Sequence, residues 1–443
     1  MTIGLAEHFT YKKLIRFTLP TIIMMIFTSI YGIVDGIFVS NFVGSDAFAA
    51  VNLIMPVLMI LGTIGFMVGT GGSALVSKTI GEGNKEKAKE YFSMLIYLLI
   101  IISFIFTIIG INLIKPIAQI LGADKNMMEY CITYGRTLLI FLTPFVLQNS
   151  FQSFLIVAEK PTFGLIISII AGITNMFLDF LFMYIFKWGV FGAALATGIS
   201  QFVGGIIPFI YFCSKKNSQL RLKKAKFEWK AIGQTCINGS SEMLTNLSLS
   251  LVNLLFNMQL MKYVGANGVV AYGVIMYIGF IFIGTYLGYS IGTAPIISYH
   301  YGAKNTDELK NLLKKSLKLI CITSIIMTVV AELLSKVFAS VFVSYDVELF
   351  DLTTKAIRLF ALSYLISGLN IFASSFFTAL NNGVVSAAIS FLRTLVFQTI
   401  MIFVLPLLLG VDGLWLSVVV AEIFAVIVSV IFLLVNKKKY NYI

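Results

Sequence analysis

Apolar runs of about 20 residues or more follow one another from end to end of this 443-residue chain, and they constrain its fold more than any other feature. A helix of about 20 apolar residues crosses a bilayer core about 30 Å thick. Because backbone groups inside a bilayer must bond within their own segment, each run is expected to be a helix. Only 12% of the residues are charged, about half of the roughly 25% usual in soluble domains. The chain is therefore predicted to be an all-α integral membrane protein.

Glycine, proline and charged residues divide the apolar runs into twelve predicted transmembrane helices. They cover residues 14–40, 47–77, 91–114, 127–157, 161–186, 189–213, 231–260, 266–300, 316–340, 349–380, 384–409 and 413–435. No loop between them is long enough for a catalytic or sensor domain, so neither an enzyme nor a receptor is expected.

Lysines and arginines are distributed unequally between the two sides of this predicted bundle. The loops on the side of the termini hold most of them, above all the segment SKKNSQLRLKKAKFEWK at 214–230. The positive-inside rule then places both termini in the cytoplasm and the protein in the cytoplasmic membrane. The net charge of +12 is thus explained by orientation, and no nucleic-acid partner is expected. The basic segment is suited to lie on anionic membrane lipid.

An internal repeat relates the two halves of the chain. A shift of 221 residues places SKTIGEGN (77–84) on SYHYGAKN (298–305), with matching Ser, Gly and Asn, and a shift of 222 places Arg136 on Arg358. Each copy holds six spans, an even number, so both copies enter the membrane in the same direction. They are expected to be related by a pseudo-two-fold axis along the membrane normal.

The repeat predicts three parts: an N-terminal six-helix lobe at 1–213, a basic cytoplasmic linker at 214–230, and a C-terminal six-helix lobe at 231–443. Two like-oriented lobes with a cavity between them are typical of a transporter in which one lobe rocks against the other. A channel, a membrane enzyme or a scaffold has no need of such a duplication. We expect a monomer.

Polar residues inside the first lobe are the strongest candidates for a functional site. Asp35 interrupts the apolar run YGIVDGIFVS, where a carboxylate costs about 2.5–3.5 kcal/mol on insertion scales. Asn175 and Asp179 lie four residues apart in ITNMFLDFLF and so share a helix face, and Thr197 ends GAALAT. Two carboxylates in a low-dielectric pocket cannot both ionise easily, so such a cluster could exchange a proton or hold Na⁺. Alternatively, these groups only form hydrogen bonds with one another that hold the helices together.

The second lobe offers candidates for a substrate cavity. Glu242 begins a polar stripe that continues through Asn246 and Asn253 at roughly helical spacing, and this stripe is expected to face the cavity between the lobes. Tyr272 and Tyr277 are spaced to share a helix side, where their rings could bind flat cations or pack against neighbouring helices. The two histidines and four scattered cysteines suggest no catalytic or metal site, and no cofactor is expected.

Several of these motifs, taken in order, resemble those of the multidrug and toxic compound extrusion (MATE) family, and in particular its MepA-like bacterial branch. The similarity extends over nearly all of the chain. It rests on TLPT (18–21), YGIVDGIFVSNFVG (31–44), GEGN (81–84) with its counterpart GAKN (302–305), NMFLDFLFM (175–183) and GAALAT (192–197).

The resemblance implies export of cationic amphipathic compounds, including antibiotics, by antiport against H⁺ or Na⁺. It assigns Asp35, Asn175, Asp179 and Thr197 to a cation-coupling site. Relatives also use acidic residues in spans 7 and 10, whereas here Glu242 lies near the start of span 7 and the body of span 10 has no carboxylate. The first lobe is therefore the better candidate for coupling.

Two other transporter classes stay open at the level of the sequence. A flippase for lipid-linked substrates shares the wider superfamily fold, but it would be expected to have a strongly cationic cavity. Another twelve-helix secondary transporter, of the major-facilitator type, usually has an arginine-containing loop between spans 2 and 3, whereas GEGNKEKAKE (81–90) has none.

Overall fold

The computed structural model describes residues 3–43, 45–214 and 219–442, and all of their side chains except those of residues 33, 36, 37, 40, 41, 45 and 46. These residues form helices and no β-strand. The first half comprises α1 (Tyr11–Phe42), α2 (Ser45–Gly81), α3 (Lys85–Ile120), α4 (Lys125–Ile140), α5 (Leu142–Val157), α6 (Pro161–Asp179), the π-helix η1 (Phe180–Ile185) and α7 (Gly189–Cys213). The second half comprises α8 (Trp229–Tyr263), α9 (Ala266–Gly302), α10 (Thr306–Leu333), α11 (Ser335–Val343), α12 (Val347–Ala361), α13 (Tyr364–Ala379), α14 (Gly383–Phe391), the π-helix η2 (Leu392–Phe397), α15 (Gln398–Leu409) and α16 (Val411–Tyr440).

These helices confirm the predicted twelve-span architecture. Among the described residues, nine segments are long and apolar enough to cross a membrane, and two further crossings are bent pairs, α4–α5 at 56° and α12–α13 at 45°. The twelfth is α8, whose 35 residues extend over about 50 Å but whose polar stripe lowers its hydropathy. The ninth span differs most from its predicted bounds, 316–340. It begins at Thr306 because the Asn305 side chain caps the helix, and a break at Leu334 separates α10 from α11.

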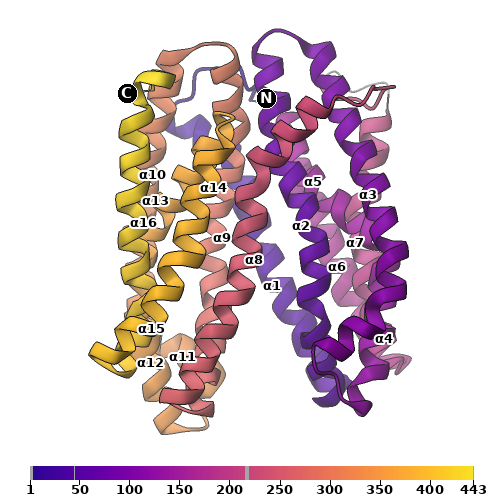
Figure 1. Ribbon diagram of the computed structural model, residues 1–443, viewed down its shortest axis with the longest axis vertical. Coiled ribbons are helices and arrows are strands. Elements are labelled where there is room, and N and C mark those ends of the chain that lie inside the picture. Colours follow the sequence, from indigo (N-terminus) through magenta and orange to yellow (C-terminus); the bar gives the residue numbers. More distant parts are fainter. Residues whose placement is uncertain (1–2, 44, 215–218, 443) are drawn as a thin grey trace.

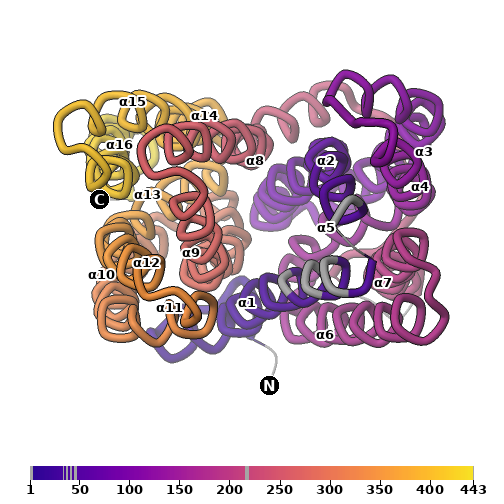
Figure 2. The backbone as a smooth tube through the Cα atoms, turned by 90° about the horizontal axis from the view of Figure 1, so that it is seen from below, coloured from indigo at the N-terminus to yellow at the C-terminus, as the bar shows by residue number. Residues whose placement is uncertain are grey.

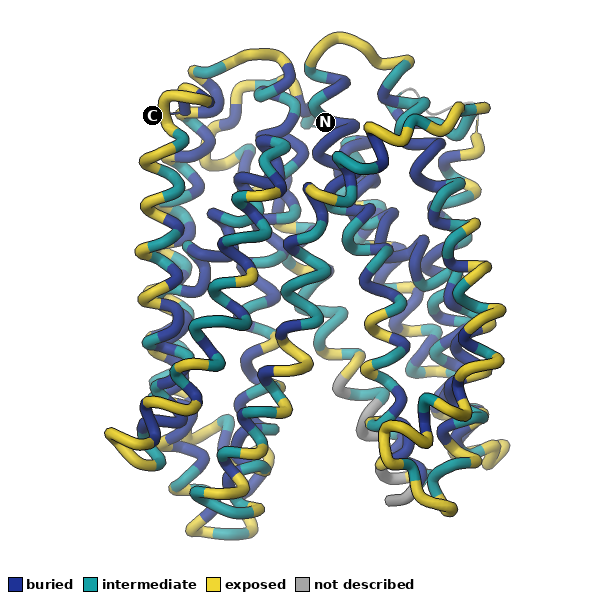
Figure 3. The backbone as a smooth tube through the Cα atoms, in the orientation of Figure 1, coloured by how far each residue is buried: buried dark blue, intermediate teal, exposed yellow. Residues whose placement is uncertain are grey.

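Helices α1–α7 and α8–α16 form two bundles that meet near the end holding both termini and separate toward the other end (Figures 1 and 2). Near the termini the apolar core is shared, since Phe17 and Ile156 of the first bundle pack in one cluster with Ile296 and Phe376 of the second. Farther away the second bundle has a core of its own, which includes Trp415. On both sides of the separation, the residues become less buried from the end that holds the termini toward the other end (Figure 3).

Repeat-related glycines make the contact between the two lobes. A Cβ added at Gly81 of α2 would lie 2.0 Å from the carbonyl oxygen of Tyr299 in α9, and one added at Gly302 would lie 2.0 Å from that of Lys78 in α2. A shift of 221 converts Lys78 and Gly81 into Tyr299 and Gly302, so the two close approaches are mates across the pseudo-two-fold axis. Only glycine lets two backbones come this close.

The asparagine of the repeated motif has a second role, because Asn84 and Asn305 cap the helices that follow. Their side chains accept hydrogen bonds from the backbone N–H groups of Lys87 and Glu308. A capping asparagine satisfies an otherwise unpaired donor and contributes about 1 kcal/mol. The matched Gly and Asn are therefore retained in both copies for packing and capping.

The N-terminal segment joins the two lobes at their closed end. The backbone N–H of Leu5 donates to Glu159, which follows α5, at 2.8 Å. The N–H of Phe9 donates to Glu308 of α10 at 2.9 Å. Both apolar side chains are buried, so this segment contacts both bundles.

The segment 214–230 runs along the first turns of α3 on the same end, and its residues 215–218 lie outside the described part of the chain. Lys223 pairs with Glu86 at 3.1 Å and with Glu90 at 3.4 Å, and Glu228 pairs with Lys87. Part of the basic charge predicted to face lipid is thus paired with α3.

Candidate functional site

The structure brings together the four residues predicted to form a cation-coupling site. Asp35 lies in α1, Asn175 and Asp179 lie one turn apart at the end of α6, and Thr197 lies in α7. The side chains of Asp179, Asn175 and Thr197 are the polar neighbours of the Asp35 carboxyl group. Asp179 and Asn175 are almost completely buried.

Local structure explains how these helices approach one another. Asp179 is the last residue of α6, and the chain continues as the π-helix η1, a widened turn that is frequent at functional sites. Gly192 at the start of GAALAT lies against Phe182 of η1, where a Cβ would come within 3.0 Å of that side chain. The small residues of this motif therefore let α7 pack closely beside the end of α6.

Several oxygens of this cluster have no hydrogen-bond donor in the part of the chain that the structure describes. Within the described residues no partner is found for five buried oxygens: Oδ1 of Asp35, Oδ1 of Asn175, both carboxyl oxygens of Asp179 and Oγ1 of Thr197. Buried polar groups in proteins are almost always paired, and a buried unpaired acceptor costs about 1–3 kcal/mol. A proton shared between the carboxyl groups, or a small cation among the oxygens, would supply the missing partner.

Tyr134 of α4 also belongs to this cluster, and the sequence interpretation missed it. Its side chain is buried, both Asp35 and Asp179 act on it electrostatically, and its hydroxyl has no partner among the described residues. A hydroxyl can donate a hydrogen bond to a carboxylate, and its oxygen can accept one from a water molecule that hydrates a cation. An intramembrane tyrosine carries no charge to mark it, and hydropathy does not tell which helix it faces.

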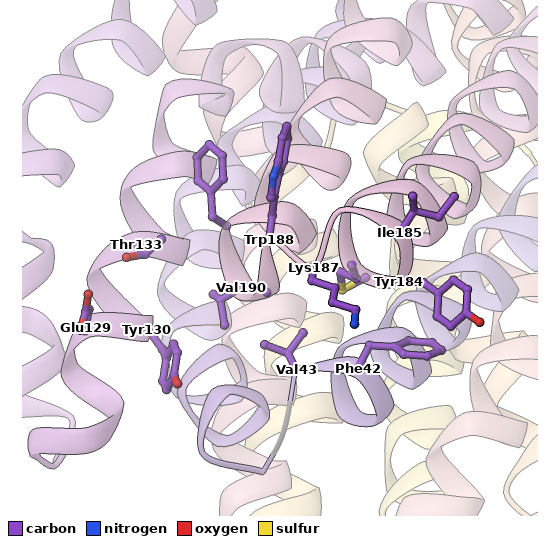
Figure 4. A pocket seen from close by; sticks show the side chains of 13 residues that line it. Phe42, Val43, Glu129, Tyr130, Thr133, Tyr184, Ile185, Lys187, Trp188 and Val190 are labelled. Carbon is purple, nitrogen blue, oxygen red and sulfur yellow. The ribbon is translucent and has the colours of Figure 1, made fainter.

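A cavity of about 900 Å³ lies at the end of the first lobe away from the termini, and Figure 4 shows side chains that line it. Its walls are the end of α1, the first turns of α4 and the turn from η1 to α7: Phe42, Val43, Glu129, Tyr130, Thr133, Met183, Tyr184, Ile185, Lys187, Trp188, Gly189, Val190 and Phe191. Thr133 precedes Tyr134, and Met183 follows Asp179 by about one helical turn. The cavity therefore ends about one turn from Asp179, and its nearest lining residue on α1, Phe42, lies about two turns from Asp35.

Glu242 lies where the two lobes meet. It lines a small cavity together with residues of α2, α5, α9 and α13, namely Thr70, Ser73, Ser153, Ile291, Ala294, Ser375 and Thr378. The amide of Asn246 donates to the backbone oxygen of Glu242 at 2.9 Å. This part of the predicted polar stripe thus faces the opposite lobe.

The stripe does not keep one environment along α8. Asn253 accepts a 2.7 Å hydrogen bond from Tyr272, whose ring stacks on Phe256 in the core of the second lobe. Tyr277 is 39% exposed and stacks on Phe342. The lobes separate along α8, so one helix face meets α2 near its start and α9 farther on. A substrate role for Asn253, Tyr272 and Tyr277 stays a prediction.

A duplicated twelve-helix bundle with a buried carboxyl pair in one lobe defines a membrane transporter. The chain belongs to the MatE family, whose model matches residues 20–181 and again residues 243–404. The second match begins 223 residues after the first (243 against 20), in agreement with the internal repeat.

Relatives extend over almost the whole chain. The Multidrug export protein MepA of Staphylococcus haemolyticus (strain JCSC1435) is 26% identical over 421 residues, covering 94% of this chain and 91% of that protein. MepA of Staphylococcus aureus (strain MRSA252) is 23% identical over 415 residues, covering 93% and 91%.

Solved structures share the fold. A multidrug resistance MATE family transporter of the MOP superfamily in an outward-facing conformation has a TM-score of 0.92 at 23% identity, covering 98% of both chains. A MATE protein in complex with MaL6 has a TM-score of 0.92 at 22% identity, also over 98% of both chains.

Proposed function

We propose that this chain is a cation-coupled antiporter that exports cationic amphipathic drugs or metabolites in exchange for H⁺ or Na⁺. It works by alternating access in the cell membrane, with both termini in the cytoplasm. Asp35, Asn175, Asp179 and Thr197 bind the coupling ion.

The unpartnered oxygens of the first lobe carry this proposal. If the cluster only held helices together, its oxygens would be expected to bond one another. Instead, two carboxyl groups, an amide and two hydroxyls converge, and each has at least one buried oxygen without a hydrogen-bond partner among the described residues. Such a site is suited to bind and release one small ion repeatedly.

The arrangement of the lobes supports alternating access. With the termini in the cytoplasm, as the lysine and arginine distribution favours, the separation between the lobes faces outward (Figure 1). The 900 Å³ cavity lies on the same side, so this conformation lets an external ion approach Asp179. Pro20 interrupts the hydrogen-bond ladder of α1, which makes α1 suited to shift when Asp35 changes its charge.

The proposed substrates follow from the relatives and from the inter-lobe region. The curated relatives are named multidrug export proteins, and Glu242 places a carboxylate at the junction of the lobes. A flippase for lipid-linked substrates is less suited to this structure. The intramembrane Arg393 is bound to Glu422 at 2.8 Å and is not free to hold a pyrophosphate.

The proposal is tested with purified protein in liposomes loaded with a fluorescent cationic dye such as ethidium. An imposed proton or Na⁺ gradient should drive dye movement against its own gradient, and collapsing that ion gradient should stop it. Dye movement that ignores both gradients would contradict the proposal.

Replacing Tyr134 by Phe should weaken binding of the coupling ion about tenfold to a hundredfold, because a hydrogen bond to a charged group contributes about 1.5–3 kcal/mol. The ring stays in place and the lost hydroxyl has no structural partner among the described residues, so thermal stability should not fall. The measurement is the ion concentration giving half-maximal dye transport. Tyr97→Phe is the matched control, since its hydroxyl donates to the backbone of Lys223. Equal ion affinity in the two variants would exclude Tyr134 from the site.

A further inference from the structure

A buried ion pair fixes the interior of the second lobe. The guanidinium of Arg393 in η2 donates to both carboxyl oxygens of Glu422 in α16, at 2.8 and 3.0 Å. The side chains of Arg393 and Glu422 are only 12% and 2% exposed. The amide of Asn370 donates to the same carboxylate at 2.7 Å, and Ser429 donates to that amide's oxygen at 2.9 Å. Unlike the carboxyl groups of the first lobe, the Glu422 carboxylate has hydrogen-bond partners at both of its oxygens.

The second carboxylate well inside this lobe is Glu242, and Arg393 is the charged group that acts on it. Among the described residues Glu242 has no ion pair closer than 4 Å, whereas Arg393 is paired with Glu422. Arg393 therefore bears on both carboxylates that lie well inside this lobe, bonded to Glu422 and acting on Glu242 from farther away. A guanidinium does not release its proton in proteins, so this positive charge is permanent.

The internal repeat shows that the carboxyl pair of the first lobe has no acidic counterpart here. Shifts of 221 to 223 place Asp35 on Phe256, Asn257 or Met258. The same shifts place Asp179 on the apolar residues Ile400, Met401 and Ile402. Both lobes keep a π-helix in the corresponding span, η1 and η2, but η1 follows a carboxylate whereas η2 contains the arginine.

We propose that Arg393 is a tethered cation that permanently occupies the second lobe, so that all exchange of the coupling ion takes place at the first-lobe cluster. The inference rests on the proposed antiport and adds to it the location and number of coupling sites. Arg393 acts as a specificity-determining residue because it holds the place that a mobile ion would otherwise take. Breaking a buried pair leaves an uncompensated charge, so removal of the arginine alone should create a new demand for a cation.

The test counts ions on purified full-length protein without substrate, as protons released on a pH jump and as ²²Na⁺ bound. We expect Asp35→Asn/Asp179→Asn to lose all of the ion exchange that the wild type shows, and Glu242→Gln to retain it. Arg393→Gln should gain about one bound cation per protein. The charge-balanced Arg393→Leu/Glu422→Leu/Glu242→Gln variant, which removes the arginine together with both carboxylates, should match the wild type, and it keeps the test valid if Arg393→Gln does not fold.

Two results would overturn the inference. One is ion exchange that persists in Asp35→Asn/Asp179→Asn and disappears when Glu242 or Glu422 is also replaced. The other is a changed ion count in the charge-balanced variant. A wild type that exchanges no ion and moves dye without a gradient would instead refute the proposed antiport, so the two failures are distinguishable.

Discussion

Replacing Asp179 by Asn should reduce gradient-driven dye export to the level of protein-free liposomes while leaving the protein at least as stable. The asparagine keeps the shape of the side chain but can neither take up a proton nor contribute a charge to a Na⁺ site. A carboxylate inside a membrane helix costs about 2.5–3.5 kcal/mol on insertion scales, and a neutral amide removes that cost. Loss of dye export together with unchanged or raised thermal stability would show that the Asp179 carboxyl group serves transport and not the stability of the fold.

The control for this variant is Asp412→Asn. Asp412 is an acidic residue in the first turn of α16, where it pairs with Lys355 at 2.7 Å, and its partial exposure means that little stability depends on the pair. Dye export should be unchanged in this control. If Asp179→Asn also exported dye at the wild-type rate, the carboxyl pair would be structural and the coupling site would lie elsewhere.

The spans and the repeat could be predicted from the sequence because the bilayer makes severe demands. A segment must be apolar over about 20 residues to cross, and each crossing reverses the chain, so hydropathy and loop charge together determine the architecture. The matched residues of GEGN and GAKN are explained by geometry: their glycines make the contact between the lobes and their asparagines cap helices.

The candidate site was predicted only in part. Asp35 and Asp179 were recognisable because a charge in a span is conspicuous, and the spacing of Asn175 placed it on the same face as Asp179. Tyr134 was missed because no local pattern shows which helices face each other. For Tyr272 the sequence left a cation-binding role and helix packing open, because the spacing of tyrosines does not tell what lies opposite a helix face. In the structure its ring stacks on Phe256 of α8 in the core of the second lobe.

Conformational balance depends on the backbone contacts of Gly81 and Gly302. An alanine at position 302 would place its Cβ 2.0 Å from the Lys78 carbonyl oxygen, and no side-chain rotation can relieve a clash with backbone. The helices must separate there, which requires the closed end to open. Overpacking costs about 1–3 kcal/mol, and we expect a conformation in which α2 and α9 lie farther apart to escape this cost.

Gly302→Ala should therefore shift the population away from this conformation by a factor of about 5 to 150, since 1.4 kcal/mol corresponds to a tenfold change. Spin labels are placed at position 85, the first residue of α3, and at position 304, in the turn after α9, in protein lacking the exposed cysteines Cys213 and Cys321. They should report a longer distance between the turns that follow α2 and α9. Gly81→Ala should produce the same change, because the pseudo-two-fold axis relates the two contacts.

Gly273→Ala is the control on α9, where an added Cβ meets no atom within 4 Å. A distance distribution in Gly302→Ala that matches this control would show that the two backbones do not limit closure. If closure is limited as we expect, dye export should slow by a comparable factor, because fewer molecules reach the conformation that opens away from the termini.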